Sequence, residues 1–185
     1  MCLDNKSLFV VCYLTLVLVL CGGKIIRYIL TEHAVITHIN SSYACCANFT
    51  SKRHGRRSPM YYVDIHYRSL VPYDNTFKVD FYFYEFLSNE YRRGFVEMHF
   101  KWCDLIHKDP FFGASMNQGK FRRPCPFPPD DYHMYNMTIP SAAIPPGFPF
   151  TKGRIFANLT HRGYDVFGGY IDMELKEKLI RSGKT

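Results

Sequence analysis

The sequence predicts an all-β protein, an antiparallel sandwich or barrel, on three observations. Aromatic residues make up 17% of the chain, with 16 Phe and 14 Tyr, and aromatic side chains favour strands. Short segments of alternating apolar and polar residues recur between turn residues. Long runs of Ala, Leu, Glu and Lys are missing, which disfavours a helical bundle. The length of 185 residues suits one domain with a single core.

Two strands, 76–86 and 94–102, are predicted to pair as a hairpin. Each alternates with a period of two, which is typical of a half-buried strand. The turn residues between them fall in 87–94. The predicted inward residues are Phe77, Val79, Phe81 and Phe83 on the first strand, and Val96, Met98, Phe100 and Trp102 on the second.

After residue 23 the chain has four N-x-[ST] sequons, at Asn40, Asn48, Asn136 and Asn158, which help to fix the register of other strands because a glycosylated Asn must face water. In 132–140 and 153–161 the neighbours of the outward Asn therefore face the core, and 168–178 alternates in the same way. The predicted inward residues are Tyr135, Met137 and Ile139, then Ile155, Ala157 and Leu159, then Ile171, Met173 and Leu175.

The remaining segments complete one sandwich domain over 43–178. Segments 43–50 and 58–70 also read as strands, whereas 103–116 breaks the alternation. We expect a short helical connector there, capped by Asp104 and interrupted by Pro110. Residues 24–42 are expected to form a lead segment with no assigned element, and 179–185 a flexible tail.

The N-terminus predicts secretion. The apolar stretch 8–21 is too short to span roughly 30 Å of hydrocarbon, so 1–23 reads as a signal peptide, with a retained signal anchor as the alternative. Of seven cysteines, four follow this segment, where pairing is the default. The formal net charge of +7 would suit an anionic surface or a receptor, through the basic loop Lys52, Arg53, Arg56 and Arg57. The same loop also reads as an exposed turn or as an R-x-x-R cleavage site, and no nucleic-acid motif appears.

Cys125 lies between Pro124 and Pro126 and could be a nucleophile, a metal ligand or half of a disulfide. A disulfide with Cys103 would close a 22-residue loop and contribute about 3 kcal/mol. The prolines fix the backbone beside Cys125 and supply no general base. We therefore expect a Cys103–Cys125 disulfide.

The sequence shows no recognised catalytic or metal-binding motif beside Cys125. The histidines have no ligand spacing, and Asp130, Asp131 and His133 read as a solvated loop. We expect no enzyme activity, no metal and no cofactor. The large apolar residues on the inward faces, together with 144–150, would either fill the core or enclose an apolar pocket.

Three segments carry a resemblance to a known family: "FKWC" ending at Cys103, "CPFPPDDYHMYNMTIP" from Cys125 and "FPFTKGRIFANL" from Phe148. With them, 43–178 resembles the ML lipid-recognition family, and most closely its secreted insect branch, which includes chemosensory members. The resemblance implies an immunoglobulin-like sandwich that holds a lipid between its sheets. One departure is the adjacent pair Cys45 and Cys46, with Arg68 where the family has a second, separated cysteine.

The sequence therefore predicts a secreted, glycosylated binding protein for a lipid, fatty acid, sterol or hydrophobic semiochemical, acting as a carrier or presenter. The alternative is an extracellular protein-interaction module with a filled core, such as an innate-immune or receptor-associated factor. Under the first reading, the predicted pocket residues are Phe77, Phe81, Phe83, Met98, Phe100, Trp102, Tyr135, Met137, Ile155, Leu159 and Met173.

Overall fold

The computed structural model describes residues 24–53, 55, 61–138 and 151–180. The predicted signal peptide, Arg56, Arg57, Ile139, 144–150 and most of the tail lie outside them. The chain divides into two compact units. One combines the two ends, Met1–Arg27 and Glu177–Thr185; the other, Tyr28–Lys176, carries the small sheet, most of the large sheet and the site described below. Among the described residues, no helix has the length and apolar character needed to cross a membrane.

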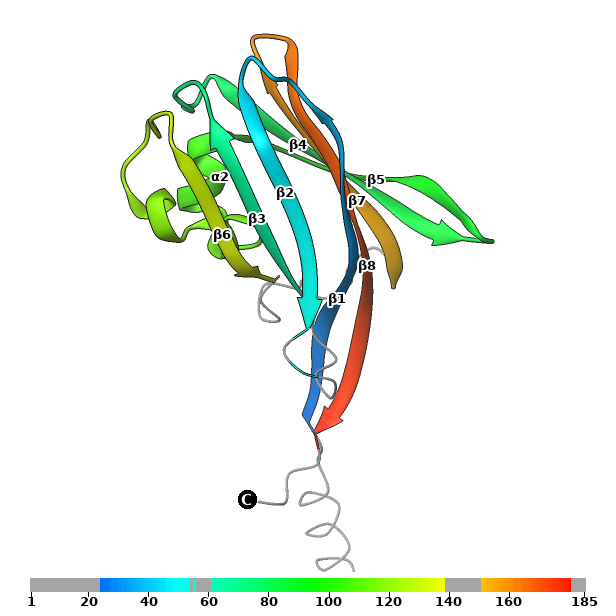
Figure 1. Cartoon of the computed structure of the whole chain (residues 1–185). Helices are drawn as coiled ribbons and strands as arrows, with labels where there is room; N and C mark the ends of the chain where they lie inside the picture. The colour runs from blue at the N-terminus through cyan, green and yellow to red at the C-terminus, as the bar shows by residue number, and fades with distance from the viewer. Residues whose placement is uncertain (1–23, 54, 56–60, 139–150, 181–185) are drawn as a thin grey trace, which may run out of the picture. The chain divides into compact units, whose positions relative to one another are not determined.

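The fold is an antiparallel sandwich of two sheets (Figure 1), as predicted. The small sheet has the order β2-β3-β6, and the large sheet has the order β1-β8-β7-β4-β5. The strand bounds of the small sheet are β2 Ala44–Arg53, β3 Tyr61–Ser69 and β6 Asp131–Met137. Those of the large sheet are β1 Lys24–Ile39, β4 Phe77–Leu87, β5 Glu90–Lys101, β7 Lys152–His161 and β8 Tyr164–Ile180.

The predicted hairpin is formed by β4 and β5. All four predicted inward residues of β4 are buried, and on β5 the predicted set Val96, Met98 and Phe100 is half-buried against the core. The turn was predicted over 87–94, which is longer than the turn in the structure. The strands are joined by Ser88 and Asn89 alone, both with positive φ (50° and 66°), a two-residue turn whose twist matches that of the strands.

Strands β7 and β8 confirm the faces predicted for 153–161 and 168–178. Ile155, Leu159 and Met173 are buried, and Ala157, Ile171 and Leu175 are half-buried. Another two-residue turn, Arg162–Gly163, joins the strands, and the φ of +86° at its second position favours glycine.

The face predicted for β6 is wrong at Tyr135, which is 50% exposed. The buried residues of this strand are Tyr132 and Met134. Asn136 has a φ of +53°, and the pairing with β3 shifts register at the same place. This bulge breaks the alternation, so Met137 still contacts the core although Tyr135 does not.

Residues 24–42, predicted without an element, contain β1, which pairs with β8. The predicted helical connector is present as α2 Trp102–Lys108, α3 Gly113–Met116 and the 3-10 turn η1 Gly119–Arg122. It contacts both sheets, because α2 packs on β4 and β5 while α3 and η1 pack on β6. The predicted cap is wrong. Lys101 is the N-cap of α2, and Asp104 lies in its first turn, paired with Lys108.

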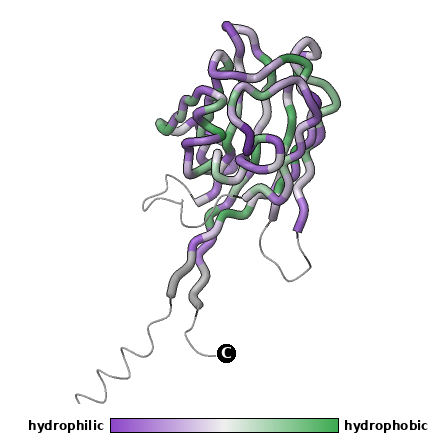
Figure 2. Tube along the Cα trace, turned by 90° about the vertical axis from the view of Figure 1, so that its left-hand side faces the viewer, coloured by the Kyte–Doolittle hydropathy of each residue, from purple (hydrophilic) through white to green (hydrophobic). Residues whose placement is uncertain are grey.

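The core lies between the sheets and is rich in aromatic rings. Green apolar and purple polar segments alternate along the chain in Figure 2, as a two-layer structure with one buried face per sheet requires. Tyr73 packs within this core, since its ring centroid lies 4.4 Å from that of Phe77 and 5.7 Å from that of Trp102.

Asp64 ties the three strands of the small sheet together. Its side chain is only 8% exposed and accepts hydrogen bonds from Lys52 Nζ on β2 (2.5 Å) and from the backbone N–H of Asn136 on β6 (2.7 Å). Burial alone would raise the pKa of Asp64, but the hydrogen bonds from Lys52 and Asn136 outweigh it and lower the pKa.

Replacing Asp64 by Asn should destabilise the protein by about 1–3 kcal/mol at neutral pH, because the charge-assisted bond to Lys52 is lost. The folded pKa of Asp64 lies below its unfolded value of about 3.9, so its contribution is complete above that pH and is lost as pH falls through the folded value. Urea unfolding from pH 7 to 3 should therefore show a smaller acid-induced loss in D64N than in the wild type.

Glu90→Gln is the matched control, because it removes the same charge from a side chain that is 71% exposed at the hairpin tip. It should leave the free energy of unfolding within about 0.5 kcal/mol of the wild type. Equal effects of the two substitutions would contradict the role assigned to Asp64.

Candidate functional site: a cavity between the sheets

A cavity of about 220 Å³ lies inside the sandwich. It is lined by residues of both sheets and of the helical connector. This volume exceeds that of an apolar cavity of about 150 Å³ that holds benzene, and is smaller than the roughly 300–1,000 Å³ of a drug-sized pocket. The core is therefore hollow, with space for a small ligand or for part of a longer one.

Six of the eleven predicted pocket residues line this cavity. They come from β4, β6, β7, β8 and the start of α2, so the strand alternation brought together side chains that are far apart in the sequence. These residues are Phe81, Trp102, Met137, Ile155, Leu159 and Met173. Their contact with a ligand remains a prediction.

The other five predicted residues, Phe77, Phe83, Met98, Phe100 and Tyr135, are not among the described lining residues. Phe77 and Phe83 are buried and pack within the core, and the ring of Phe77 stacks on His161 at 4.2 Å. Met98 and Phe100 belong to β5, which is the edge strand and contributes none of the described lining residues. Tyr135 points to the outer face beside His66, with ring centroids 5.0 Å apart.

Most of the wall supplied by the small sheet and the connector was not predicted from the sequence. The connector is not periodic, so alternation gave no sign that Leu105, Phe112 and Met116 turn inward. Further lining residues that were not predicted as pocket residues lie on strands of both sheets, on α3 and in the segments beside the strands. They are Thr31, Ala34, Ala47, Phe49, Val63, Ile65, Tyr67, Tyr73, Val79, Ser115, Met134, Thr138, Ala157, Phe167, Gly169, Tyr170 and Ile171.

The cavity wall carries no charge among its described residues, which include no Asp, Glu, Lys, Arg or His. Burial raises the pKa of Tyr67 and Tyr73 well above the ordinary tyrosine value, so both hydroxyls stay neutral at physiological pH. Such a wall suits an uncharged, largely apolar molecule.

The Cys103–Cys125 disulfide is present, as predicted, with Cα atoms 6.0 Å apart. It joins the start of α2 to the segment before β6. Its first cysteine, Cys103, directly follows the lining residue Trp102. The backbone N–H of Cys103 also donates to Asn75 Oδ1 at 3.0 Å. The sulfur of Cys125 is therefore part of the covalent link that holds the connector against the sheets.

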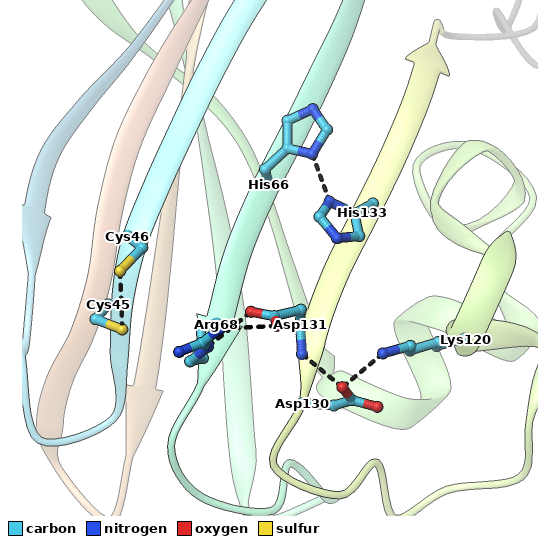
Figure 3. A network of polar contacts seen from close by, with 8 residues as sticks. All are labelled: Cys45, Cys46, His66, Arg68, Lys120, Asp130, Asp131 and His133. Atoms are coloured by element: carbon cyan, nitrogen blue, oxygen red, sulfur yellow. Dashed lines mark hydrogen bonds and ion pairs between the residues drawn. The ribbon is translucent and has the colours of Figure 1, made fainter.

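The predicted solvated residues Asp130, Asp131 and His133 lie on the outer face of the small sheet (Figure 3). Asp131 forms a two-point ion pair with Arg68 at 2.8 and 2.9 Å, which lowers its pKa. Lys120 lies 2.5 Å from Asp130 and lowers its pKa by a hydrogen bond. A general acid needs a raised pKa, so both shifts go in the opposite direction.

Two pairs of like side chains occupy the same face. His133 Nδ1 lies 2.6 Å from His66 Nδ1 on the neighbouring strand (Figure 3). Cys45 and Cys46 are free thiols with their Sγ atoms 3.2 Å apart, and their hydrogen bond raises the pKa of Cys45. Arg68 is the cross-strand partner of Cys45, which is where the family resemblance implies a second cysteine.

No group of three or more His, Cys, Asp or Glu side chains in the described part of the chain is arranged to hold a metal ion. Of the basic loop, Lys52 pairs with Asp64 and Arg53 lies over the ring of Tyr61.

The sequon residues Asn48 and Asn136 are exposed. Asn40 and Asn158 are half-buried, and each donates its amide to Asp165 at 3.3 Å.

Residues 76–154, from the start of β4 into β7, match the model of a family described as "Protein of unknown function (DUF1091)". The matched region includes the disulfide and the cavity-lining part of the connector. No curated protein shows significant similarity to the chain.

Proposed function

We propose that the protein binds a lipid or a similar hydrophobic small molecule between its two sheets and acts as its carrier or presenter. The observation that supports this function best is the cavity of about 220 Å³ in the core, with an uncharged wall over its described residues. A packed domain leaves few voids larger than a water molecule, and an empty cavity lowers stability. A ligand that fills the cavity would give a reason for its presence.

Two sequence features support the same proposal. The signal-like N-terminus and the four sequons fit a secreted glycoprotein that meets its ligand outside the cell. The resemblance to the ML family, including its chemosensory branch, agrees with a sandwich that holds a lipid. The driving force would be burial of the apolar ligand, at about 25 cal/mol per Å².

The rival function, an interaction module that binds a receptor through its surface, requires a filled core. A specific feature in its favour is Phe95 on the edge strand β5, which is 93% exposed. The exposed aromatic residues Phe95, Tyr135 and Tyr164 lie on three different strands, whereas the cavity involves both sheets and the connector. We therefore favour the carrier.

Native mass spectrometry of the protein secreted from insect cells tests the proposal. A carrier should show a discrete extra mass that leaves on denaturation and proves to be a lipid or another hydrophobic compound. A clean apo mass that persists after incubation with mixed fatty acids, sterols and neutral long-chain compounds would reject the carrier and favour the surface-binding module.

A further inference from the structure

The side chains of Cys45 and Cys46 lie together on the outer face of the small sheet (Figure 3), although the two residues are adjacent in a strand. Successive side chains of a regular strand point to opposite faces of its sheet. In β2 the pairing with β3 shifts register between Cys45 and Asn48, and Cys46 has a φ of +58°. This bulge brings the two Sγ atoms to 3.2 Å from each other.

The backbone conformation at Cys46 is unusual for its residue type. A φ in this region favours glycine, and a residue with a Cβ is strained there. Strained residues persist where the surrounding structure fixes them, and they gather at functional sites. The contact that this conformation produces is the one between the two thiols, so the pair itself is a candidate site.

Within the described part of the chain, the pair has no other thiol with which to bond. Cys103 and Cys125 are bonded to each other, and the residue opposite Cys45 on β3 is Arg68. Cys46 is exposed, and in an oxidising compartment an exposed thiol pairs with its neighbour or with a second chain. The neighbouring sulfur at 3.2 Å has a far higher effective concentration than a thiol of another molecule.

We propose that Cys45 and Cys46 form a disulfide with each other, and that this bond is more easily reduced than Cys103–Cys125. An S–S bond is about 2.05 Å long, so the two sulfur atoms need to approach by roughly 1 Å. The ring would contain these two residues alone and would be exposed, and strained or exposed disulfides are the labile ones. Because it closes no longer loop, it should add little to the free energy of unfolding.

A disulfide such as oxidised glutathione would be the oxidant. The thiolate of the exposed Cys46 attacks one sulfur of this disulfide, forms a mixed disulfide and displaces one glutathione thiolate. The thiolate of Cys45 then attacks the Cys46 sulfur, forms the Cys45–Cys46 bond and displaces the second glutathione thiolate. The two cysteines lose two protons and two electrons, and the oxidised glutathione becomes two molecules of glutathione.

Alkylation and peptide mapping of the protein secreted from insect cells test this inference. Trypsin should release residues 28–52, which contain Cys45, Cys46 and no other cysteine. After removal of N-linked glycans, this peptide should resist N-ethylmaleimide and should be lighter by two hydrogen atoms than its reduced form. Increasing concentrations of dithiothreitol should make these two thiols reactive before those of Cys103 and Cys125.

Variants distinguish this bond from one between chains. Cys45→Ser leaves the exposed Cys46 without its neighbour and should give disulfide-linked dimers on a denaturing, non-reducing gel. The wild type and Cys45→Ala/Cys46→Ala should both run as single chains. The double variant should also bind the fluorescent apolar probe N-phenyl-1-naphthylamine as tightly as the wild type, because neither cysteine lines the cavity.

Three results would overturn the Cys45–Cys46 bond. They are alkylation of both cysteines after incubation with oxidised glutathione, a wild-type dimer linked through residues 28–52, and a bond from this peptide to another cysteine of the chain. Opening of Cys103–Cys125 at the same or a lower concentration of dithiothreitol would contradict the greater lability. Failure of every protein to bind the probe would count against the carrier function and leave the disulfide unaffected, since the inference does not rest on that function.

Discussion

Ala157→Phe should weaken uptake of N-phenyl-1-naphthylamine about thirtyfold. Ala157 is a small residue at the centre of the large sheet, between Phe81 on β4 and Gly169 on β8, and all three line the cavity. A phenyl group there would occupy volume that the ligand needs. Displacing between two and three methylene equivalents, at about 0.8 kcal/mol each, costs about 2 kcal/mol of binding free energy.

The same substitution should leave the apo protein folded, because added apolar atoms fill an existing void. Urea unfolding and probe binding measured on one preparation would check both statements. Ala114→Phe is the matched control, since Ala114 is exposed on α3 and does not line the cavity. A folded A157F protein with wild-type affinity would show that the probe binds elsewhere and would favour surface recognition.

The sequence predicts the faces of β4, β7 and β8 well because their alternation is uninterrupted. It fails at Tyr135 because one bulged residue, Asn136, shifts the pattern, and a bulge of this kind leaves no periodic trace. It also assigns pocket residues to β5. Alternation along a strand separates inward from outward residues, but it does not distinguish a central strand from an edge strand such as β5.

The missed part of the cavity has a different cause. The wall from Leu105 to Met116 lies on short helices whose placement depends on tertiary contacts with both sheets. Tyr67 was not predicted as a pocket residue because the alternation in β3 is weak. Nothing in the local sequence indicates that its hydroxyl has no hydrogen-bond partner. Buried polar pairing is a property of the assembled core, so it becomes visible only in three dimensions.

The second large effect should come from removing the disulfide. The variant Cys103→Ala/Cys125→Ala opens a loop with a sequence separation of 22 residues and should lose about 3 kcal/mol of unfolding free energy, as the chain-entropy model gives. That loop contains most of α2, together with α3 and η1, and residues of α2 and α3 contribute to the cavity wall. Probe affinity should therefore fall along with stability, because the connector is held less firmly against the cavity.

Cys45→Ala/Cys46→Ala provides the control, since both cysteines are free thiols on the outer face of the small sheet. It deletes two sulfur atoms as well but opens no loop, so its unfolding midpoint in urea should stay close to that of the wild type. Reducing agent should destabilise the wild type and this control equally and leave the C103A/C125A variant unchanged. If C103A/C125A were as stable as the wild type, packing of Trp102 and Leu105 alone would hold the connector, and the disulfide would have no role in shaping the cavity.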